Sequence, residues 1–233
     1  MLGGSTVTNT GPSVIFGDVG VSPGSAIVGF PPGSVTPPST FHRGNATSLA
    51  AQTSDVAAYG VLAGQACPAA NNLTGQDLGG LTLNPGVYCF PSTSAQLTGT
   101  LTLNALGNPA SVFIFQIGST LTTASNSVVS VINGGSRCNV FWQVGSSATL
   151  GTTTAFAGNL LALGSITLNT GASIINGRAL AQTGAVTLDT NQISIATCPG
   201  ATAVPALSEW AFIMLALLLA TAGALALRRR SSV

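Results

Sequence analysis

The chain has 233 residues, of which 45% are hydrophobic and 5% are charged, and it contains no lysine. A hydrophobic share this high allows the buried core of one domain and argues against disorder. The scarcity of charge leaves no basic stripe for phosphate groups, which argues against nucleic-acid binding. Most other residues are Thr, Ser, Asn and Gly, which together with β-branched residues indicate strands and turns.

The N-terminal end shows no export signal. Met1–Ser5 has neither the basic nor the apolar region of a signal peptide. The C-terminal tail nevertheless predicts export, so we expect that the recorded start is too late or that the sequence is trimmed, and that a signal peptide is missing. Residues 30–40 (FPPGSVTPPST) form a Pro-rich loop.

Residues 45–66 lack β character and are rich in Ala, which predicts one helix. Asn45 fits an N-cap. Leu49, Val56 and Leu62 form an imperfect apolar stripe at helical spacing, which predicts that the helix lies along the β-rich part of the chain. A glycine within this helix weakens it by about 1 kcal/mol relative to Ala.

Residues 78–195 carry a rough repeat of strands and glycines. The repeated glycines Gly118, Gly145, Gly164 and Gly184 lie 27, 19 and 20 residues apart. A period near twenty is too short for helical repeats and fits one coil of a β-solenoid. Because one coil cannot bury its inward face alone, we expect stacked coils to form the core.

The four cysteines are far apart in the sequence, so no two of them form a Cys-x-x-Cys pair. His42 is near none of them. This spacing argues against a zinc site, and we expect neither a metal nor a cofactor. Exported cysteines usually pair. We favour Cys67–Cys89, which closes a short loop, and Cys138–Cys198, which would fix the chain end. Four cysteines allow three connectivities, and free buried thiols remain an alternative.

Residues 210–230 form a separate apolar tail. Residues 211–227 are a run of seventeen apolar or small residues, and Arg228–Arg230 follow at once. At about 1.5 Å per residue the run just crosses a bilayer core, with Trp210 at one interface and the Arg cluster on the cytoplasmic side. A buried helix of a soluble domain is disfavoured because the run is apolar on every face. We therefore expect a C-terminal transmembrane helix, with the body periplasmic or extracellular.

The linker at residues 199–209 ends in a short motif. The motif includes Trp210, the first residue of the tail. Its residues are Val204, Pro205, Ala206, Leu207, Ser208, Glu209 and Trp210. The motif resembles the Ile-Pro-Thr-Leu-Ser-Glu-Trp hallmark of IPTL-CTERM sorting tails, with departures at Val204 and Ala206. The resemblance implies processing by an exosortase-like membrane enzyme and release from, or attachment to, the cell surface.

Residues 3 to about 197 resemble the microbial ice-binding proteins. The motifs that carry the resemblance stand in one order along the chain: Ser5–Gly11, Gly17–Gly24, Gly29–Pro32, Gly79–Tyr88, Val112–Gly118, Asn139–Ser146 and Asn176–Ala181. The resemblance implies a mainly β fold over residues 1–198, a discontinuous right-handed parallel β-helix of triangular section with one long helix along a face. The family usually has another strand before the Ser5–Gly11 motif, so we expect an N-terminal strand to be missing here. We expect a monomeric body.

An ice-binding face must be flat, rigid and regularly spaced. Stacked strands repeat at about 4.8 Å, and Thr has a stiff side chain with a hydroxyl and a methyl group. Aligning the segments that follow the repeated Leu predicts an ice-binding face formed by Thr123, Ser125, Thr152, Thr154, Thr170 and Thr190, with Gln192 a weaker member. Some family members carry a Thr-(Ala/Gly)-x-(Thr/Asn) pattern, which Thr123–Asn126 resembles. A second candidate column lies beside inward leucines: Thr82, Thr102, Thr167 and Thr187. Thr at such positions also suits ordinary exposed strands.

The expected function is ice binding, as an antifreeze or an inhibitor of ice recrystallisation, by a protein displayed or released at the bacterial surface. The alternative is a structural or adhesive solenoid that contacts exopolysaccharide and has no affinity for ice. An enzyme is the least favoured class, because the chain has no Lys and no Ser-His-Asp set. The aspartates before the tail are spread along the chain, and we expect them to serve turns and caps: Asp18, Asp55, Asp77 and Asp189.

Overall fold

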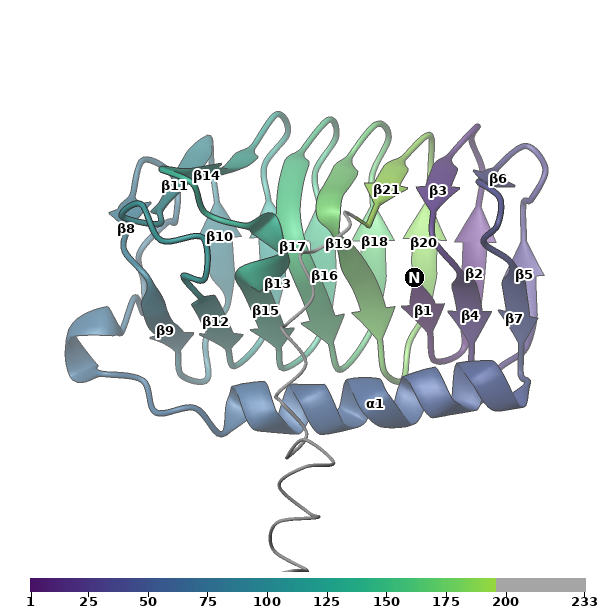
Figure 1. The fold of residues 1–233 in the computed structure, drawn as a ribbon, viewed down its shortest axis with the longest axis horizontal. Coiled ribbons are helices and arrows are strands. Elements are labelled where there is room, and N and C mark those ends of the chain that lie inside the picture. The colour runs from purple at the N-terminus through teal and green to yellow at the C-terminus, as the bar shows by residue number, and fades with distance from the viewer. Residues whose placement is uncertain (196–233) are drawn as a thin grey trace, which may run out of the picture. The chain divides into compact units, whose positions relative to one another are not determined.

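The structure, a computed structural model, describes residues 1–195. These residues form coils of parallel strands stacked on one another, and one long helix lies along the stack (Figure 1). The strands fall into three rows, here called the first, second and third faces in the order in which a coil such as β11–β12–β13 visits them. Parallel stacking with one helix agrees with the expected mainly β solenoid.

The first and second faces belong to one 14-stranded sheet. The first face contains, in spatial order, β8 (Thr82–Leu83), β11 (Thr100–Asn104), β14 (Val128–Ile132), the first part of β17 (Ala155–Ala162), the first part of β19 (Ser173–Ala181), β21 (Gln192–Ser194), β3 (Val14–Phe16) and β6 (Ser34–Val35). The second face contains β9 (Gly86–Phe90), β12 (Phe113–Ile117), β15 (Val140–Val144), the later parts of β17 and β19, β1 (Leu2–Gly3), β4 (Val19–Val21) and β7 (Phe41–Arg43).

The third face is a separate 7-stranded sheet. Its strands are, in spatial order, β10 (Ala95–Leu97), β13 (Leu121–Thr123), β16 (Ala148–Leu150), β18 (Ile166–Leu168), β20 (Val186–Leu188), β2 (Thr6–Asn9) and β5 (Ala26–Val28). The N-terminal strands β2 and β5 therefore stack beyond β20, which comes late in the sequence. The solenoid is discontinuous, as the resemblance implied.

The core is a column of aromatic and aliphatic side chains inside the coils. Phe115 and Trp142 are paired in register and stack with their ring centroids 4.0 Å apart. The buried Trp142 indole N–H donates to the Ala157 carbonyl at 3.0 Å, so this ring is held without an unsatisfied polar group. Between faces the chain turns at close backbone contacts. A side chain at Gly177 would meet the Gly158 carbonyl oxygen, so only glycine fits this corner.

One end of the stack is capped by the segment that precedes the first complete coil. Leu73 N–H donates to Cys89 O and Leu78 N–H donates to Gln96 O, both at 2.9 Å, which pairs the otherwise open edges of β9 and β10. The side chains of Leu73 and Leu78 are buried. A short 3-10 helix, Ala69–Asn71, lies in the same segment, and a second one, Arg137–Asn139, precedes β15.

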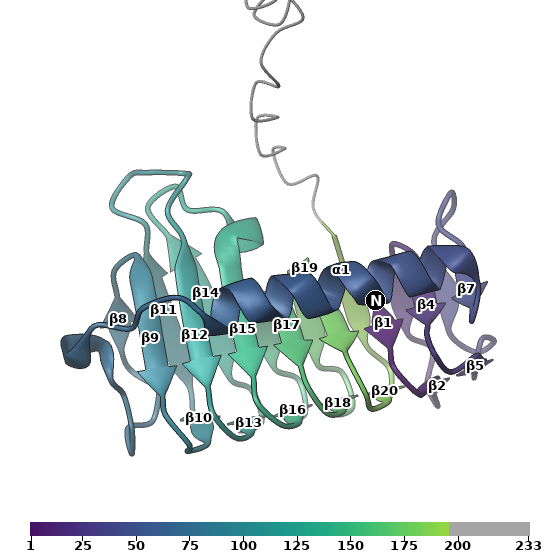
Figure 2. The ribbon, with the colours of Figure 1, turned by 90° about the horizontal axis from the view of Figure 1, so that it is seen from below.

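The long helix α1 (Ala46–Ala63) runs across the second face (Figure 2). Asn45 is its N-cap, as predicted, and the Asn45 side chain accepts a hydrogen bond from Ser48 N–H at 3.0 Å. The predicted apolar stripe is wrong at Leu49 and Val56, which are 59% and 52% exposed, whereas Leu62 is buried as expected.

The buried stripe of α1 is largely polar instead: Ser48, Gln52, Asp55 and Leu62. The reason lies in the sheet below, which presents amide groups to the helix. Gln116 donates to Leu62 O at 2.8 Å, and Gln143 donates to the Tyr59 hydroxyl at 2.6 Å. Hydrogen bonds therefore replace much of the apolar packing that usually holds a surface helix.

A disulfide joins Cys67 to Cys89, as predicted, with 22 residues of sequence separation. It connects the segment after α1 to β9 at the capped end. Cys198 lies outside the described residues, so the predicted Cys138–Cys198 pair stays a prediction. The predicted transmembrane run, residues 211–227, also lies outside them. Within residues 1–195, no helix is both long enough and apolar enough to cross a membrane.

The first prediction concerns the Cys67–Cys89 disulfide. Replacing both residues with Ser opens a loop of this length and should lower the free energy of unfolding by about 3 kcal/mol. For a body of this size we expect the Tm to fall by about 6–12 °C. Thermal denaturation of the chain and of the double variant measures the difference. A Tm that does not change would show that the capped end holds without the covalent link.

The second prediction concerns Asp55, whose pKa is raised to about 6 by burial, against a smaller opposing effect of the Gln182 side chain. The folded state therefore binds this proton more tightly than the unfolded state, in which the pKa has its ordinary value of 3.8. Stability is greatest below that value and is lost as the pH rises through about 6. Because solvent partly reaches Asp55 and screens its charge, we expect the loss of unfolding free energy to be about 1–2 kcal/mol.

The matched control is Asp55→Asn, which keeps the shape of the side chain and cannot ionise. The amino group of Met1 also has a pKa near this range, lowered to about 6 by burial, and it acts in the opposite direction as the pH rises. Subtracting the Asp55→Asn stability curve from that of the parent chain isolates Asp55. A flat difference between pH 4 and pH 8 would contradict the prediction.

Candidate functional site

The third face presents one column of threonines to solvent. Four pairings place its members directly opposite one another: Thr122 with Thr149, Thr149 with Thr167, Thr167 with Thr187, and Thr187 with Thr8. We call these five residues the threonine ladder. Each is the outward residue between two inward neighbours, because successive side chains of a strand point to opposite faces.

The inward neighbours hold the ladder in place. Ala148 and Leu150, on either side of Thr149, are 1% and 0% exposed. A shift of one residue in this strand would bring Thr149 inside and two apolar side chains out, so burial fixes the register. Consecutive strands in a sheet lie about 4.8 Å apart, which sets the spacing of the hydroxyl and methyl groups along the ladder.

The ladder ends at residues of other kinds. On one side Gln96 pairs with Thr122, and on the other Val28 pairs with Thr8. The column two residues earlier in each strand contains only small side chains: Ser94, Thr120, Ser147, Ser165, Ala185, Thr6 and Ala26. Small side chains leave the threonines unobstructed on this side.

The strands of the third face contain no charged residue. The nearest carboxylate along the chain is Asp189, at the corner after β20, and it accepts hydrogen bonds from the hydroxyls of Thr170 and Thr190. These two hydrogen bonds lower the pKa of Asp189, so this group is an anion held at the corner rather than on the ladder. The ladder is thus a neutral surface of regularly spaced hydroxyls and methyls, suited to ordering water rather than to binding an ion.

Two residues of the first predicted column are buried. Thr123 and Thr154 are 3% and 0% exposed, and their hydroxyls hydrogen-bond to each other at 2.8 Å inside the solenoid. They cannot belong to an exposed face. The prediction failed because Leu121 lies opposite Ala148 and not opposite Leu150, so Thr123 takes the inward place that Leu150 takes in the next coil.

The other residues of that column lie at the corner where the third face turns into the first. Ser125, Thr152, Thr170 and Thr190 are exposed there, outside the strands. The weaker member, Gln192, is the first residue of β21 on the first face, opposite Ser173. The corner threonines therefore border the third face without forming part of its sheet.

The second predicted column is divided between two faces. Thr167 and Thr187 belong to the threonine ladder, whereas Thr82 and Thr102 pair with each other on the first face. The prediction missed Thr8, Thr122 and Thr149. The signal was the tripeptide of one apolar residue, Thr and Leu, which recurs as Ala148–Leu150, Ile166–Leu168 and Val186–Leu188.

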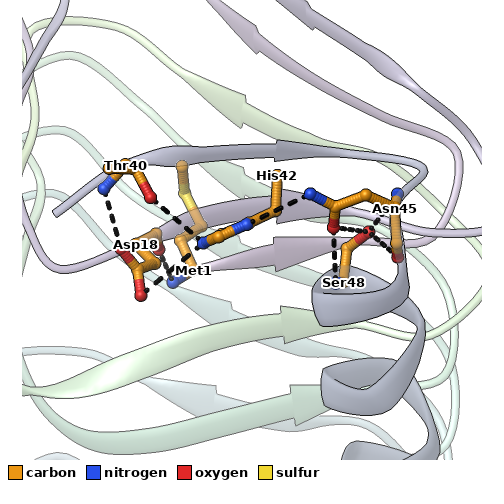
Figure 3. A network of polar contacts seen from close by, with 6 residues as sticks. All are labelled: Met1, Asp18, Thr40, His42, Asn45 and Ser48. Carbon is orange, nitrogen blue, oxygen red and sulfur yellow. Dashed lines mark hydrogen bonds and ion pairs between the residues drawn. The ribbon is translucent and has the colours of Figure 1, made fainter.

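A polar network around His42 is a second place where chemistry could be sought (Figure 3). Thr40 Oγ1 lies 3.2 Å and Asp18 Oδ2 lies 3.8 Å from the same ring nitrogen, Nε2. In a hydrolytic triad the nucleophile and the carboxylate contact different ring nitrogens. Here the other nitrogen, Nδ1, faces Asn45, which caps α1. The network therefore connects β7 and the N-terminus of α1 to the turn that contains Asp18.

Asp18 and Asp77 have structural partners as well. Asp18 Oδ1 accepts the Thr40 N–H at 2.8 Å, and Asp77 Oδ1 accepts the Gly79 N–H at 2.7 Å. These two and Asp189 serve turns, as expected, whereas Asp55 faces the solenoid from the helix. Over residues 1–195, no three His, Cys, Asp or Glu side chains stand close enough together to hold a metal ion.

Comparisons with known proteins identify the family of the chain. A family model described as Ice-binding-like matches residues 1–194, and a model of the IPTL-CTERM motif matches residues 202–230. An ice-binding protein of Nostoc sp. (strain HG1) is 59% identical over 194 residues, which are 83% of this chain and 70% of that protein.

Two crystal structures show the same fold. An ice-binding protein from an Antarctic biological consortium superposes with a TM-score of 0.78 and 43% identity, covering 82% of this chain and 85% of the other. An ice-binding protein from the Antarctic ascomycete Antarctomyces psychrotrophicus gives a TM-score of 0.78 and 40% identity, covering 84% and 93%. With its repeat, its parallel stack and these matches, the chain belongs to the ice-binding-like family and ends in an IPTL-CTERM motif.

Proposed function

We propose that this protein binds ice through the threonine ladder on its third face. The observation that carries the proposal is the register of the five threonines, which places one hydroxyl and one methyl group on each of five successive strands of a sheet without charged residues. The names of its relatives point to the same activity.

The mechanism is the ordering of water on a rigid template. Thr has a stiff χ1, so its hydroxyl is held at a fixed place, and its methyl group favours an ordered hydration layer. The spacing along the stack, about 4.8 Å, is near the spacing of oxygens in ice. Because the sheet register and the packed core fix the threonines before binding, little conformational entropy is lost when the ordered water joins a crystal.

We propose that the body acts outside the cytoplasm. The Cys67–Cys89 disulfide fits an oxidising compartment, and the IPTL-CTERM motif fits export and sorting. In this proposal, residues 211–227 hold the protein in the membrane with Arg228–Arg230 on the cytoplasmic side. An exosortase-like enzyme then processes the tail, which leaves the body attached to or released from the cell surface. The proposed function involves no catalysis.

The third prediction tests the ladder directly. Thr149→Tyr places a bulky ring at the centre of the third face and keeps the surface away from ice. We expect ice recrystallisation inhibition to require about tenfold more protein, equivalent to about 1.4 kcal/mol, and thermal hysteresis to fall. The matched control is Thr102→Tyr, the same change on the first face, which should leave both measurements unchanged. Circular dichroism checks that both variants fold.

The corner threonines need the same test, because they formed the first predicted site. Thr170→Tyr should reduce activity less than Thr149→Tyr. If Thr170→Tyr abolished activity and Thr149→Tyr did not, the binding surface would be the corner. If a folded protein showed neither inhibition nor hysteresis, the proposal would give way to a structural or adhesive solenoid, and retention of the protein by exopolysaccharide would be the next measurement.

The fourth prediction separates stability from ice binding at neighbouring threonines. Thr123→Val removes a buried hydroxyl that accepts the Gly151 N–H at 2.8 Å and bonds to Thr154. Leaving these groups without a partner should cost about 1–3 kcal/mol of unfolding free energy. Because Thr123 points inward, ice activity per folded molecule should not change. A loss of activity without a loss of stability would contradict the assignment of the ladder.

A further inference from the structure

Helix α1 is inverted in comparison with an ordinary surface helix. A surface helix usually buries apolar residues and exposes charged ones. In α1 the buried residues are mostly polar, and Asp55, the only charged residue of the helix, is among them. The large apolar side chains point to solvent instead: Leu49, Val56 and Val61 are each more than half exposed. Hydrogen bonds to the solenoid explain the polar inner side, but they do not explain the apolar outer side.

These three residues belong to one continuous surface. At 3.6 residues per turn they lie on the side of the helix that is turned away from its buried residues. The exposed positions between them carry small side chains: Ala46, Ala50, Thr53, Ala57 and Gly60. We call these eight residues the outer face of α1. The Thr53 hydroxyl donates to the Leu49 carbonyl at 3.0 Å, so the proton of the one polar side chain is already bonded within the helix.

The outer face lies on the outside of the molecule, because α1 runs along the outer side of the second face (Figure 2). Single exposed apolar residues are common on soluble proteins and need no partner. A continuous apolar surface without charge is different, because it marks a contact with another protein or with a membrane. The choice between these two occupants depends on the size of the surface and on the path of the chain.

The size of the outer face argues against a second copy of the chain. A helix of 18 residues is about 27 Å long and about 10 Å wide. Two such faces packed together would bury about 600 Å² in total by these dimensions. Stable protein interfaces bury about 1,200 Å² or more. A contact this small forms only where something else already holds the two surfaces close together.

The path of the chain favours a lipid bilayer. The described body ends at Ile195, which lines the same surface pocket as Ala58 of α1. Residues 196–210 connect it to the apolar run, and fifteen residues span at most about 50 Å in any conformation. If the run is held in a membrane, as proposed above, the body stays near the bilayer surface. A weak apolar contact then becomes intramolecular and gains a high effective concentration.

We propose that the outer face of α1 lies on the surface of the lipid bilayer that holds residues 211–227. The proposal rests on the membrane attachment proposed above and adds the surface through which the body contacts lipid. The apolar side chains of such a helix enter the boundary between headgroups and acyl chains. Because the outer face contains no Lys or Arg, the contact depends on apolar burial and not on attraction to anionic lipids. The threonine ladder belongs to a different sheet, so it stays in water.

The test uses the full chain, reconstituted in phosphatidylcholine vesicles whose acyl chains carry a quencher. A fluorescent label at Val56→Cys reports contact with lipid. The matched control is the same label at Val28→Cys on the third face, because these valines are 52% and 58% exposed. The parent chain, taken through the same labelling, gives the background from its own cysteines.

We expect the quencher to remove about half of the fluorescence at Val56, because an interfacial helix inserts its apolar face about 5–10 Å deep. The label at Val28 should keep its fluorescence. Adding phosphatidylglycerol to the vesicles, or raising the salt concentration, should change neither result. Quenching at Val56 that required the anionic lipid would assign the contact to basic residues elsewhere and would overturn the proposal.

A charge on the outer face should break the contact. Val61→Glu in the chain labelled at Val56 should restore most of the fluorescence, because a carboxylate is costly to place in lipid. Val28→Glu is the matched control and should restore none. Both valines are exposed, so circular dichroism should show that both variants keep the fold. Equal quenching in the two variants would contradict the proposal.

Flotation of the protein with the vesicles separates the two proposals. A chain that floats with the vesicles but is not quenched at Val56 keeps its membrane attachment and overturns the contact by α1. A chain that does not float overturns the attachment and the contact together. Energy transfer between labels at Val56 of different molecules, without quenching by lipid, would assign the outer face to a second copy and would also overturn the proposal.

Discussion

The structure depends on the in-register stacking of parallel strands. Backbone hydrogen bonds between coils fix which residue lies above which, and a slip of one residue would turn every side chain of a strand to the opposite face. The same register places Trp142 over Phe115 inside the solenoid and Thr149 over Thr122 outside it. Core and ladder are therefore two consequences of one constraint. A shift of register in one coil would therefore displace its core residue and its ladder residue together.

The threonine ladder is completed by residues from both ends of the described chain. Thr187 and Thr8 are 179 residues apart in sequence, and their hydroxyls lie 3.4 Å apart. Helix α1 makes this possible, because it carries the chain along the second face from the N-terminal coils to the capped end, and the later coils then build back toward the start (Figure 1). Such pairings close long loops and form slowly in folding. The side of the ladder that includes Thr8 thus depends on the N-terminal coils being folded in place.

Local features of the fold could be predicted from the sequence, whereas features that depend on register could not. The helix and its Asn45 cap follow from neighbouring residues, and a period near twenty indicates coils. The threonine column was misplaced because the coils differ in length, so aligning Leu121 with Leu150 shifted the register by two residues. The buried stripe of α1 was misjudged for a similar reason. Whether Gln52 or Leu49 faces inward depends on the amide groups that the second face presents, and those belong to strands distant in sequence.

Scarcity of charge connects the composition to the proposed activity. A solenoid that presents Lys or Glu on its third face would hold strongly hydrated, mobile groups above the sheet, and these would compete with a regular water layer. Ser and Thr side chains keep the surface wettable without such groups, and no charged side chain belongs to the ladder. Asp189 is held at a corner by the hydroxyls of Thr170 and Thr190, and Asp55 is turned inward on α1. On the second face, by contrast, amide hydrogen bonds hold the helix over the buried carboxyl of Asp55. The packing of α1 against the solenoid is therefore sensitive to pH, whereas the neutral ladder is not.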